Sequence, residues 1–154
     1  MPGHAVDLGC GTGRQARYLA TAGPSPRPTR PRRPGSARTR EGRAEPKTHC
    51  VQWRLADVTE PRQVDPGGRL GGVDLLLDNG CLHGIPDAHR RGWANIVRAL
   101  AAPGCVLLVR AAPRGRRGPA PSGLGPDELP ALLGEGWACG ALPEPHWYRC
   151  VRQH

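Results

Sequence analysis

The sequence contains no phenylalanine, one methionine and two tyrosines among its 154 residues. Leucine, valine and alanine must therefore supply most of any hydrophobic core. The chain also lacks an apolar run near the roughly 20 residues that cross a membrane, and it has no N-terminal signal pattern. We therefore expect no membrane partner. This length suits one domain, and we expect residues 1–154 to form a single one.

No two of the six cysteines have the C-x-x-C spacing that zinc sites use. They stand at positions 10, 50, 81, 105, 139 and 150, mostly in or beside apolar runs. Cysteine in such surroundings packs as a small hydrophobic residue. This usage is typical of reduced cysteines, and it predicts a cytoplasmic protein without a bound metal.

Basic charge is concentrated in one segment. Residues Pro24–Lys47 hold seven arginines and one lysine against two glutamates, a net charge of +6 out of the total of +9. The segment also holds six prolines and no Val, Ile, Leu, Met or aromatic residue. It has little to bury, so we expect it to be disordered. Because it has no aromatic side chain to stack on bases, nucleic acid is the weakest candidate partner, and a small molecule is the expected one. The sequence gives no sign of the oligomeric state.

Apolar periodicity predicts that strands alternate with helices along the rest of the chain. We expect helices over residues 14–22, 87–101 and 127–133, strands over residues 4–8, 51–58, 73–78 and 105–109, and a closing hairpin over residues 137–142 and 147–151. In the second strand, Val51, Trp53 and Leu55 alternate with polar residues, which predicts that these three side chains face the core. The alternation of elements is typical of an α/β fold with a mainly parallel sheet.

The longest predicted helix has a clear inner face and a clear start. Its apolar residues at helical spacing are Trp93, Ile96, Val97 and Leu100. Asp87 stands where a side chain can cap the first turn. Pro103 and Gly104 then end the helix before the next strand.

Acidic residues stand at the ends of three predicted strands. Asp7, Asp57 and Asp78 each follow or close an apolar run. In parallel α/β sheets, ligands bind beyond the carboxyl ends of the strands. These three acids are therefore candidate ligand contacts at one edge of the sheet.

A glycine-rich turn joins the first strand to the first helix. Residues Ala5–Gly13 read Ala-Val-Asp-Leu-Gly-Cys-Gly-Thr-Gly, with Gly9, Gly11 and Gly13 at G-x-G-x-G spacing and Asp7 two residues before the first glycine. Nucleotide folds that hold a pyrophosphate use G-x-G-x-x-G instead. This segment resembles motif I of the class I S-adenosylmethionine-dependent methyltransferases.

Three later segments extend this resemblance, so that it covers most of residues 4–22 and 50–152. Leu55–Thr59 looks like the third-strand segment that meets the adenine of the donor in that family. Asp78–Pro86 resembles the segment after the fourth strand in the thiopurine methyltransferase-like and tellurite-resistance-like branch, and Trp147–Arg152 resembles its last strand. The resemblance implies a Rossmann-like class I methyltransferase sheet, mainly parallel, with a C-terminal antiparallel hairpin.

The resemblance also implies a site for S-adenosylmethionine. Its members would be Asp7, Gly9, Cys10, Gly11, Gly13, Asp57, Val58, Asp78 and Asn79. By this resemblance the glycines admit the methionyl and ribose parts of the donor, and Asp7 positions its amino group. Asp57 accepts from the adenine amine, and Val58 packs on the ring. Asp78 and Asn79 lie near the transferred methyl group, and His83 lines the acceptor pocket.

The sequence departs from the family at the second strand and at the N-terminus. The family places an acid that binds the ribose hydroxyls about 20 residues after motif I, yet no acid stands between Asp7 and Glu41. One hypothesis is that residues 24–47 are read in the wrong frame; the other is a genuine basic linker. Motif I also begins almost at Met1, so we expect no helical lid over the donor.

The expected activity is methyl transfer from S-adenosylmethionine to a small molecule, in which the protein chiefly holds donor and acceptor in alignment. Asp78 and His83 are the candidate bases. The alternative is a methyltransferase-like protein whose catalysis is impaired, because the ribose acid and the lid are missing. The sequence does not identify the methyl acceptor.

Overall fold

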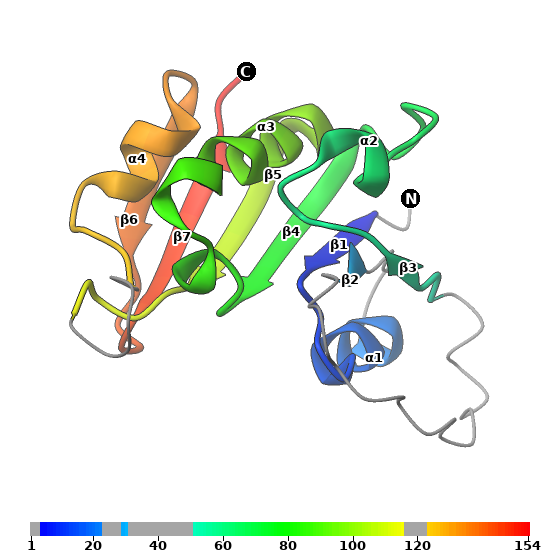
Figure 1. The fold of residues 1–154 in the computed structure, drawn as a ribbon, viewed down its shortest axis with the longest axis horizontal. Helices are drawn as coiled ribbons and strands as arrows, with labels where there is room; N and C mark the ends of the chain where they lie inside the picture. The colour runs from blue at the N-terminus through cyan, green and yellow to red at the C-terminus, as the bar shows by residue number, and fades with distance from the viewer. Residues whose placement is uncertain (1–3, 23–28, 31–50, 116–122) are drawn as a thin grey trace.

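The computed structural model describes residues 4–22, 29–30, 51–115 and 123–154. Within these ranges a seven-stranded sheet has the strand order β3-β2-β1-β4-β5-β7-β6. All pairings from β3 through β5 are parallel, and β7 pairs antiparallel with both β5 and β6. Figure 1 shows α2, α3 and α4 grouped together, apart from α1. The predicted α/β class, with a mainly parallel sheet and a closing antiparallel hairpin, is confirmed.

Three apolar runs form the centre of the sheet, as the sequence predicts. They are β1 (Ala5–Leu8), β4 (Val73–Asn79) and β5 (Ala101–Arg110). The third of these strands begins earlier than predicted. Pro103 and Gly104 lie within it and do not end the preceding helix, which already ends at Leu100.

In register, Leu8 stands beside Asp78 and Asp78 beside Val109, so the carboxyl ends of these strands meet at one edge. The predicted candidate residues Asp7 and Asp78 are thereby brought to neighbouring strands.

The strands beyond β1 are short. β2 (Thr29–Arg30) and β3 (Arg54–Leu55) have two residues each. Residues 29–30 thus form a strand, although they lie within the segment that was predicted to be disordered. The rest of the predicted disordered segment lies outside the described residues.

Val51, Trp53 and Leu55 were predicted to face the core, and this prediction is wrong for two of the three. Val51 is buried, but Trp53 is 48% exposed and Leu55 is 65% exposed. β3 is the outermost strand on this side of the sheet. An edge strand of two residues has one neighbouring strand to pack beside, so its apolar side chains are not forced inward.

The helices begin and end close to the predicted positions. They are α1 (Arg14–Ala22), α3 (Arg90–Leu100) and α4 (Glu128–Leu133), and a short α2 (Pro61–Val64) was not predicted. Two 3-10 turns, η2 (Leu82–Gly84) and η3 (Asp87–His89), lead into α3. The predicted cap by Asp87 is wrong, because its carboxylate pairs with Arg90 and Arg114 instead.

One hydrophobic core lies between the sheet and α3 and α4. Its members include Leu76, Leu107 and Cys150 from the strands, and all four residues of the predicted inner face of α3, namely Trp93, Ile96, Val97 and Leu100. Ala16 of α1 is buried but does not belong to this cluster. The predicted inner face of the long helix is confirmed.

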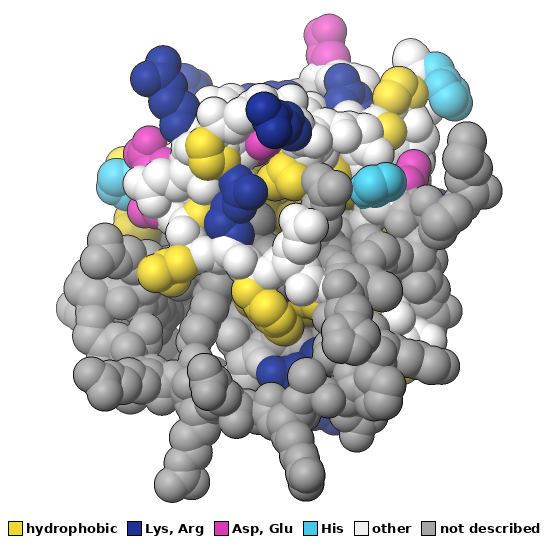
Figure 2. All heavy atoms as spheres, turned by 90° about the vertical axis from the view of Figure 1, so that its right-hand side faces the viewer, with side chains coloured by type: hydrophobic (Ala, Val, Ile, Leu, Met, Phe, Trp, Pro, Cys, Tyr) yellow, Lys and Arg dark blue, Asp and Glu magenta, His cyan; other side chains and the backbone are white. Residues whose placement is uncertain are grey.

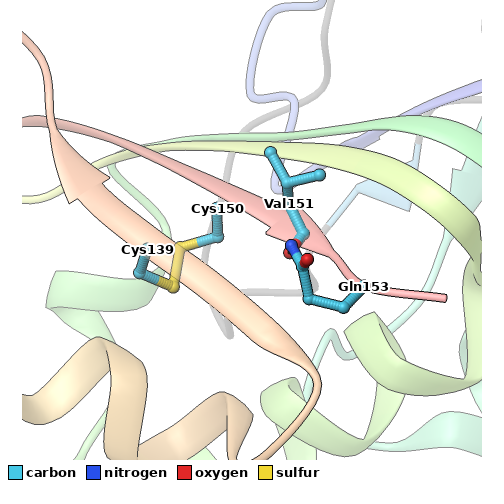
Figure 3. Close-up of a disulfide and its surroundings, with 4 residues drawn as sticks. All are labelled: Cys139, Cys150, Val151 and Gln153. Atoms are coloured by element: carbon cyan, nitrogen blue, oxygen red, sulfur yellow. A yellow bond between two sulfur atoms is a disulfide. The ribbon is translucent and has the colours of Figure 1, made fainter.

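The C-terminal hairpin is joined by a disulfide between Cys139 and Cys150 (Figure 3). These residues stand directly opposite each other in β6 (Trp137–Ala141) and β7 (Trp147–Arg152). The expectation of reduced cysteines is therefore wrong for this pair. Spacing along the chain did not reveal it, because hairpin pairing brings together residues that are 11 positions apart.

Reduction of this disulfide is expected to lower the melting temperature. Loop-closure entropy for a crosslink over 11 positions predicts a loss of about 3 kcal/mol in the free energy of unfolding. Thermal unfolding with and without dithiothreitol measures the effect, and Cys139→Ser should melt at the lower temperature in both conditions. Peptide mapping that found both thiols unbonded in unreduced protein would contradict the pairing.

Helix α3 packs directly against the loop that follows β3. A Cβ on Gly92 would collide with the backbone carbonyl of Thr59. Because the neighbour is backbone, it cannot swing aside as a flexible side chain would. Gly92 therefore sets how closely α3 approaches the loop that carries Asp57 and Val58.

Replacing Gly92 with alanine is expected to destabilise the protein. Alanine inside a helix ordinarily gains up to about 1 kcal/mol over glycine, but the clash here should lower the free energy of unfolding by about 1–3 kcal/mol. Urea unfolding measures the change. Gly71→Ala is the matched control, since the nearest atom to its added Cβ is an ordinary 3.8 Å away. A Gly92→Ala protein that is more stable than wild type would refute this packing.

Candidate functional site

The glycine-rich turn between β1 and α1 has left-handed backbone at all three predicted glycines. The φ angles are 72° at Gly9, 55° at Gly11 and 79° at Gly13, a region that side chains rarely adopt. The Gly13 N–H donates to the Cys10 carbonyl at 2.8 Å, which closes the turn. Apart from its chain neighbours, no atom of the described residues lies within 4 Å of the position where a Cβ of Gly11 would stand, so a ligand can approach the backbone there.

Gly13 has a different neighbour. A Cβ at this residue would collide with the indole ring of Trp53, and Arg17 of α1 lies 5.7 Å from the centre of that ring. The space beside Gly13 is therefore filled by protein. Figure 2 shows the molecule from the side of β3, where hydrophobic side chains lie next to those of lysine or arginine.

Two buried carboxyl groups lie on neighbouring strands at the edge of the sheet, one register position apart, since Asp7 pairs with Leu77 and Asp78 with Leu8. Asp7 is 1% exposed and Asp78 is fully buried. Burial, followed by the charge of Asp78, raises the pKa of Asp7 to about 7, although the backbone N–H of Ala16 opposes the shift. Burial also raises the pKa of Asp78 to about 6, against several hydrogen bonds that favour its ionised form. A cation placed beside Asp7 would favour the ionised form.

The carboxylate of Asp78 is hydrogen-bonded to N–H groups of the protein. It accepts from the backbone N–H of Cys81 at 2.8 Å and of Leu82 at 3.1 Å, and from the indole N–H of Trp93 at 2.9 Å. These bonds hold the turn η2 and helix α3 against the end of β4. Asp78 therefore organises the segment that the sequence analysis assigned to the donor and acceptor.

Asn79, the next residue, offers an acceptor. The Oδ1 atom of its side chain is buried without a hydrogen-bond partner among the described residues. A buried polar atom without a partner is costly, and such atoms mark places where a ligand can supply the missing donor. Asn79 lies at the carboxyl end of β4, on the same edge as Asp7.

Asp57 and Val58 lie in the loop after β3. The Oδ1 atom of Asp57 accepts from the backbone N–H of Thr59 at 2.8 Å and from its hydroxyl at 2.7 Å, so the carboxylate shapes its own turn. Val58 is 2% exposed and belongs to the hydrophobic core. Packing of Val58 on an adenine ring would therefore require a local rearrangement.

His83 lies in η2, between the ends of β4 and β5. Its Nδ1 atom accepts from the backbone N–H of Ala112 at 3.2 Å. Burial lowers the pKa of His83, and the charges of Arg110 and Arg90 lower it further. The ring is thus neutral near pH 7, and its proton resides on Nε2, since Nδ1 is an acceptor.

A network of ion pairs that was not predicted from the sequence lies beside His83. Arg90, 1% exposed, donates to the carbonyl oxygens of Ile85 and Gly123 at 2.9 Å and binds the carboxylate of Glu128. Arg114 joins the same Glu128 at 2.7 Å and Asp87 at 2.9 Å. Burial alone would raise the pKa of Glu128, but its bonds to Gly125 and to both arginines lower it to about 2. No sequence signal pairs residues that stand 38 positions apart.

The described residues hold no group of three or more histidine, cysteine, aspartate or glutamate side chains that could bind a metal ion. None of the described helices is both long and apolar enough to span a membrane. No protein-family model and no curated protein matches the sequence.

Solved methyltransferase structures are similar in fold. The 1,6-didemethyltoxoflavin-N1-methyltransferase of Burkholderia thailandensis, with bound S-adenosylhomocysteine, is 19% identical at a TM-score of 0.61, and the match covers 99% of this chain and 72% of that one. CalS10, an amino pentose methyltransferase of Micromonospora echinaspora with bound S-adenosylmethionine, is 13% identical at a TM-score of 0.69, and the match covers 99% of this chain and 84% of that one. TehB of Haemophilus influenzae is 14% identical at a TM-score of 0.65, and the match covers 99% of this chain and 58% of that one.

The chain thus has the fold of the class I S-adenosylmethionine-dependent methyltransferases, as the resemblance implied. The inclusion of TehB agrees with the expected tellurite-resistance-like branch at the level of the fold. The chain spans 58% of the length of TehB.

Replacing Asp7 with asparagine is expected to stabilise the protein at pH 8. The folded-state pKa of about 7 lies above the ordinary value of 3.8, so the unfolded chain releases this proton first as the pH rises. Stability is therefore lost between about pH 4 and 7, by at most about 4 kcal/mol, and asparagine avoids this loss. Urea unfolding of Asp7→Asn should show a gain at pH 8 that disappears toward pH 4.

Asp127→Asn is the control for this measurement, because Asp127 is an exposed carboxylate. Its replacement should change the free energy of unfolding by less than about 0.5 kcal/mol. An Asp7→Asn protein that is equally or less stable than wild type at pH 8 would show that the Asp7 carboxyl is not buried as described.

Proposed function

We propose that this protein binds S-adenosylmethionine and transfers its methyl group to a small-molecule acceptor. The observation that carries the proposal is the left-handed turn at Gly9, Gly11 and Gly13, which stands beside the buried Asp7 at the carboxyl edge of the sheet. The known fold supports it, since the similar structures include methyltransferases with bound S-adenosylmethionine or S-adenosylhomocysteine.

The residues present fit a cationic donor. Asp7 and the buried Oδ1 of Asn79 are acceptors that suit an ammonium group, and the open space beside Gly11 admits a ligand to the backbone. Asp57 would take the adenine amine, with Gly9 and Cys10 lining the turn. When bound, S-adenosylmethionine would supply a methyl group on an already activated sulfonium. Gly13 would contribute through its contact with Trp53 and not through the ligand.

Neither candidate base, Asp78 or His83, is a well-placed proton acceptor in the described parts of the chain. The oxygens of Asp78 accept from backbone and indole N–H groups, and Nδ1 of His83 accepts from Ala112. His83 therefore presents a donor, Nε2–H, to an incoming molecule. We infer that the acceptor arrives already nucleophilic, as a thiolate or a neutral amine does, and that the protein acts through alignment.

A catalytically impaired protein is the second candidate. It is favoured by β2, which reads Thr29-Arg30 and carries no acid at the position where the family binds the ribose hydroxyls. A lost ribose contact would weaken donor binding without changing the fold. The coding DNA across residues 24–47 decides between a misread frame and a genuine linker, since only a misread frame would offer a strand that ends in Asp or Glu.

Isothermal titration with S-adenosylmethionine is expected to show binding in the micromolar range for wild type and none for Gly11→Arg. Gly68→Arg is the matched control: Gly68 has a φ of 60° and the same open surroundings, but it lies in the loop before β4. Equal binding by both variants would refute the assignment of the turn. Absence of heat from wild type at high ligand concentration would favour the impaired protein.

A further inference from the structure

Arg110 is the last residue of β5, and its backbone pairs with β4 and β7. Its guanidinium makes no hydrogen bond or ion pair within the described parts of the chain. Its side chain is exposed at the carboxyl edge of the sheet. Arg90 and Arg114 differ from Arg110, because both bind groups of the protein: Arg90 binds a carboxylate and carbonyl oxygens, and Arg114 binds carboxylates. An unpaired guanidinium at the ligand edge of an α/β sheet is a binding group without a partner.

Two candidate site residues lie beside Arg110. Asn79 is its direct partner in the register of β4 and β5. His83 accepts from the backbone of Ala112, two residues after Arg110, so the ring is fixed at the same end of β5. The ring also lies close to Gly80, since a Cβ added to that glycine would stand 3.2 Å from Cε1 of His83.

The edge of the sheet is divided by charge. On the side of β1 and β4, Asp7 and Asn79 Oδ1 present acceptors, which fit the cationic donor. On the side of β5, Arg110 and the Nε2–H of His83 present donors, which fit an anion. A cation and an anion bound on these two sides would lie next to each other.

We propose that Arg110, assisted by His83, binds a carboxylate on the methyl acceptor. The inference rests on the proposed function and adds the class of acceptor: a small acid that carries a thiol or an amine near its carboxylate. A guanidinium binds a carboxylate through two parallel hydrogen bonds, which fixes the orientation as well as the position of the acceptor. A thiol acceptor would lose its proton to water; its sulfur would then bond to the methyl carbon as the sulfonium–methyl bond breaks.

The test compares 3-mercaptopropionate with its neutral amide, 3-mercaptopropionamide. Their equilibrium binding to the full chain is followed by ligand-observed NMR, with and without saturating S-adenosylhomocysteine. The variants are Arg110→Gln, Arg110→Lys and the control Arg91→Gln, because Arg91 is an exposed arginine on α3 without a described partner. This readout does not depend on turnover.

Wild type is expected to bind the acid at least about tenfold more tightly than the amide, because one hydrogen bond to a charged group raises affinity by about that factor. Arg110→Gln should abolish this preference and leave the amide unchanged. Arg110→Lys should keep part of the preference, because it retains the charge but not the paired hydrogen bonds. Arg91→Gln should behave as wild type.

Equal binding of acid and amide to wild type, or a preference that survives in Arg110→Gln, would overturn the proposal. Titration of the same proteins with S-adenosylmethionine separates this failure from that of the proposed function. Donor binding with no preference for the acid refutes only the acceptor class. A preference for the acid that depends on Arg110 but comes without donor binding supports the anion site and refutes methyl transfer.

Discussion

The buried carboxylate of Asp78 is the interaction on which the ligand edge of this protein depends. A carboxyl group with no exposed surface is costly unless it is hydrogen-bonded, and Asp78 accepts from two backbone amides of η2 and from the indole of Trp93. These bonds hold the turn over the end of β4 and place His83 against β5. Loss of this one group would remove the bonds that join η2 and Trp93 to the end of β4.

A second buried polar centre completes the same side of the molecule. Arg90 lies at the start of α3 and binds carbonyl oxygens on both sides of it, while Glu128 joins it to α4. Both centres replace water around a charged group with backbone of the protein, so they fix loops that have little apolar surface of their own. In a chain without phenylalanine, such polar contacts do part of the positioning that large core side chains do elsewhere.

Much of the fold could be predicted from the sequence, because its signals are local. The helix over residues 14–22, the apolar face of α3 and the closing hairpin follow from spacing alone, and so does the glycine turn. The exposed Trp53, the pairing of Asp87 with Arg114 and the disulfide of Cys139 depend on which strands and loops become neighbours. Spacing along the chain carries no information on such contacts, so the roles of the acidic residues and of His83 came mainly from the resemblance, and the arginines at this edge were not predicted.

The contact between Trp53 and Gly13 makes the glycine turn optically observable. Of the four tryptophans, Trp53 is the exposed one; Trp93 is fully buried, and Trp137 and Trp147 are half-buried. Indole emission depends on the polarity around the ring, and this ring touches the turn on one side and Arg17 on the other. The protein therefore carries an intrinsic fluorophore at the turn, so the binding of a ligand there can be followed in real time by tryptophan emission without attaching a dye.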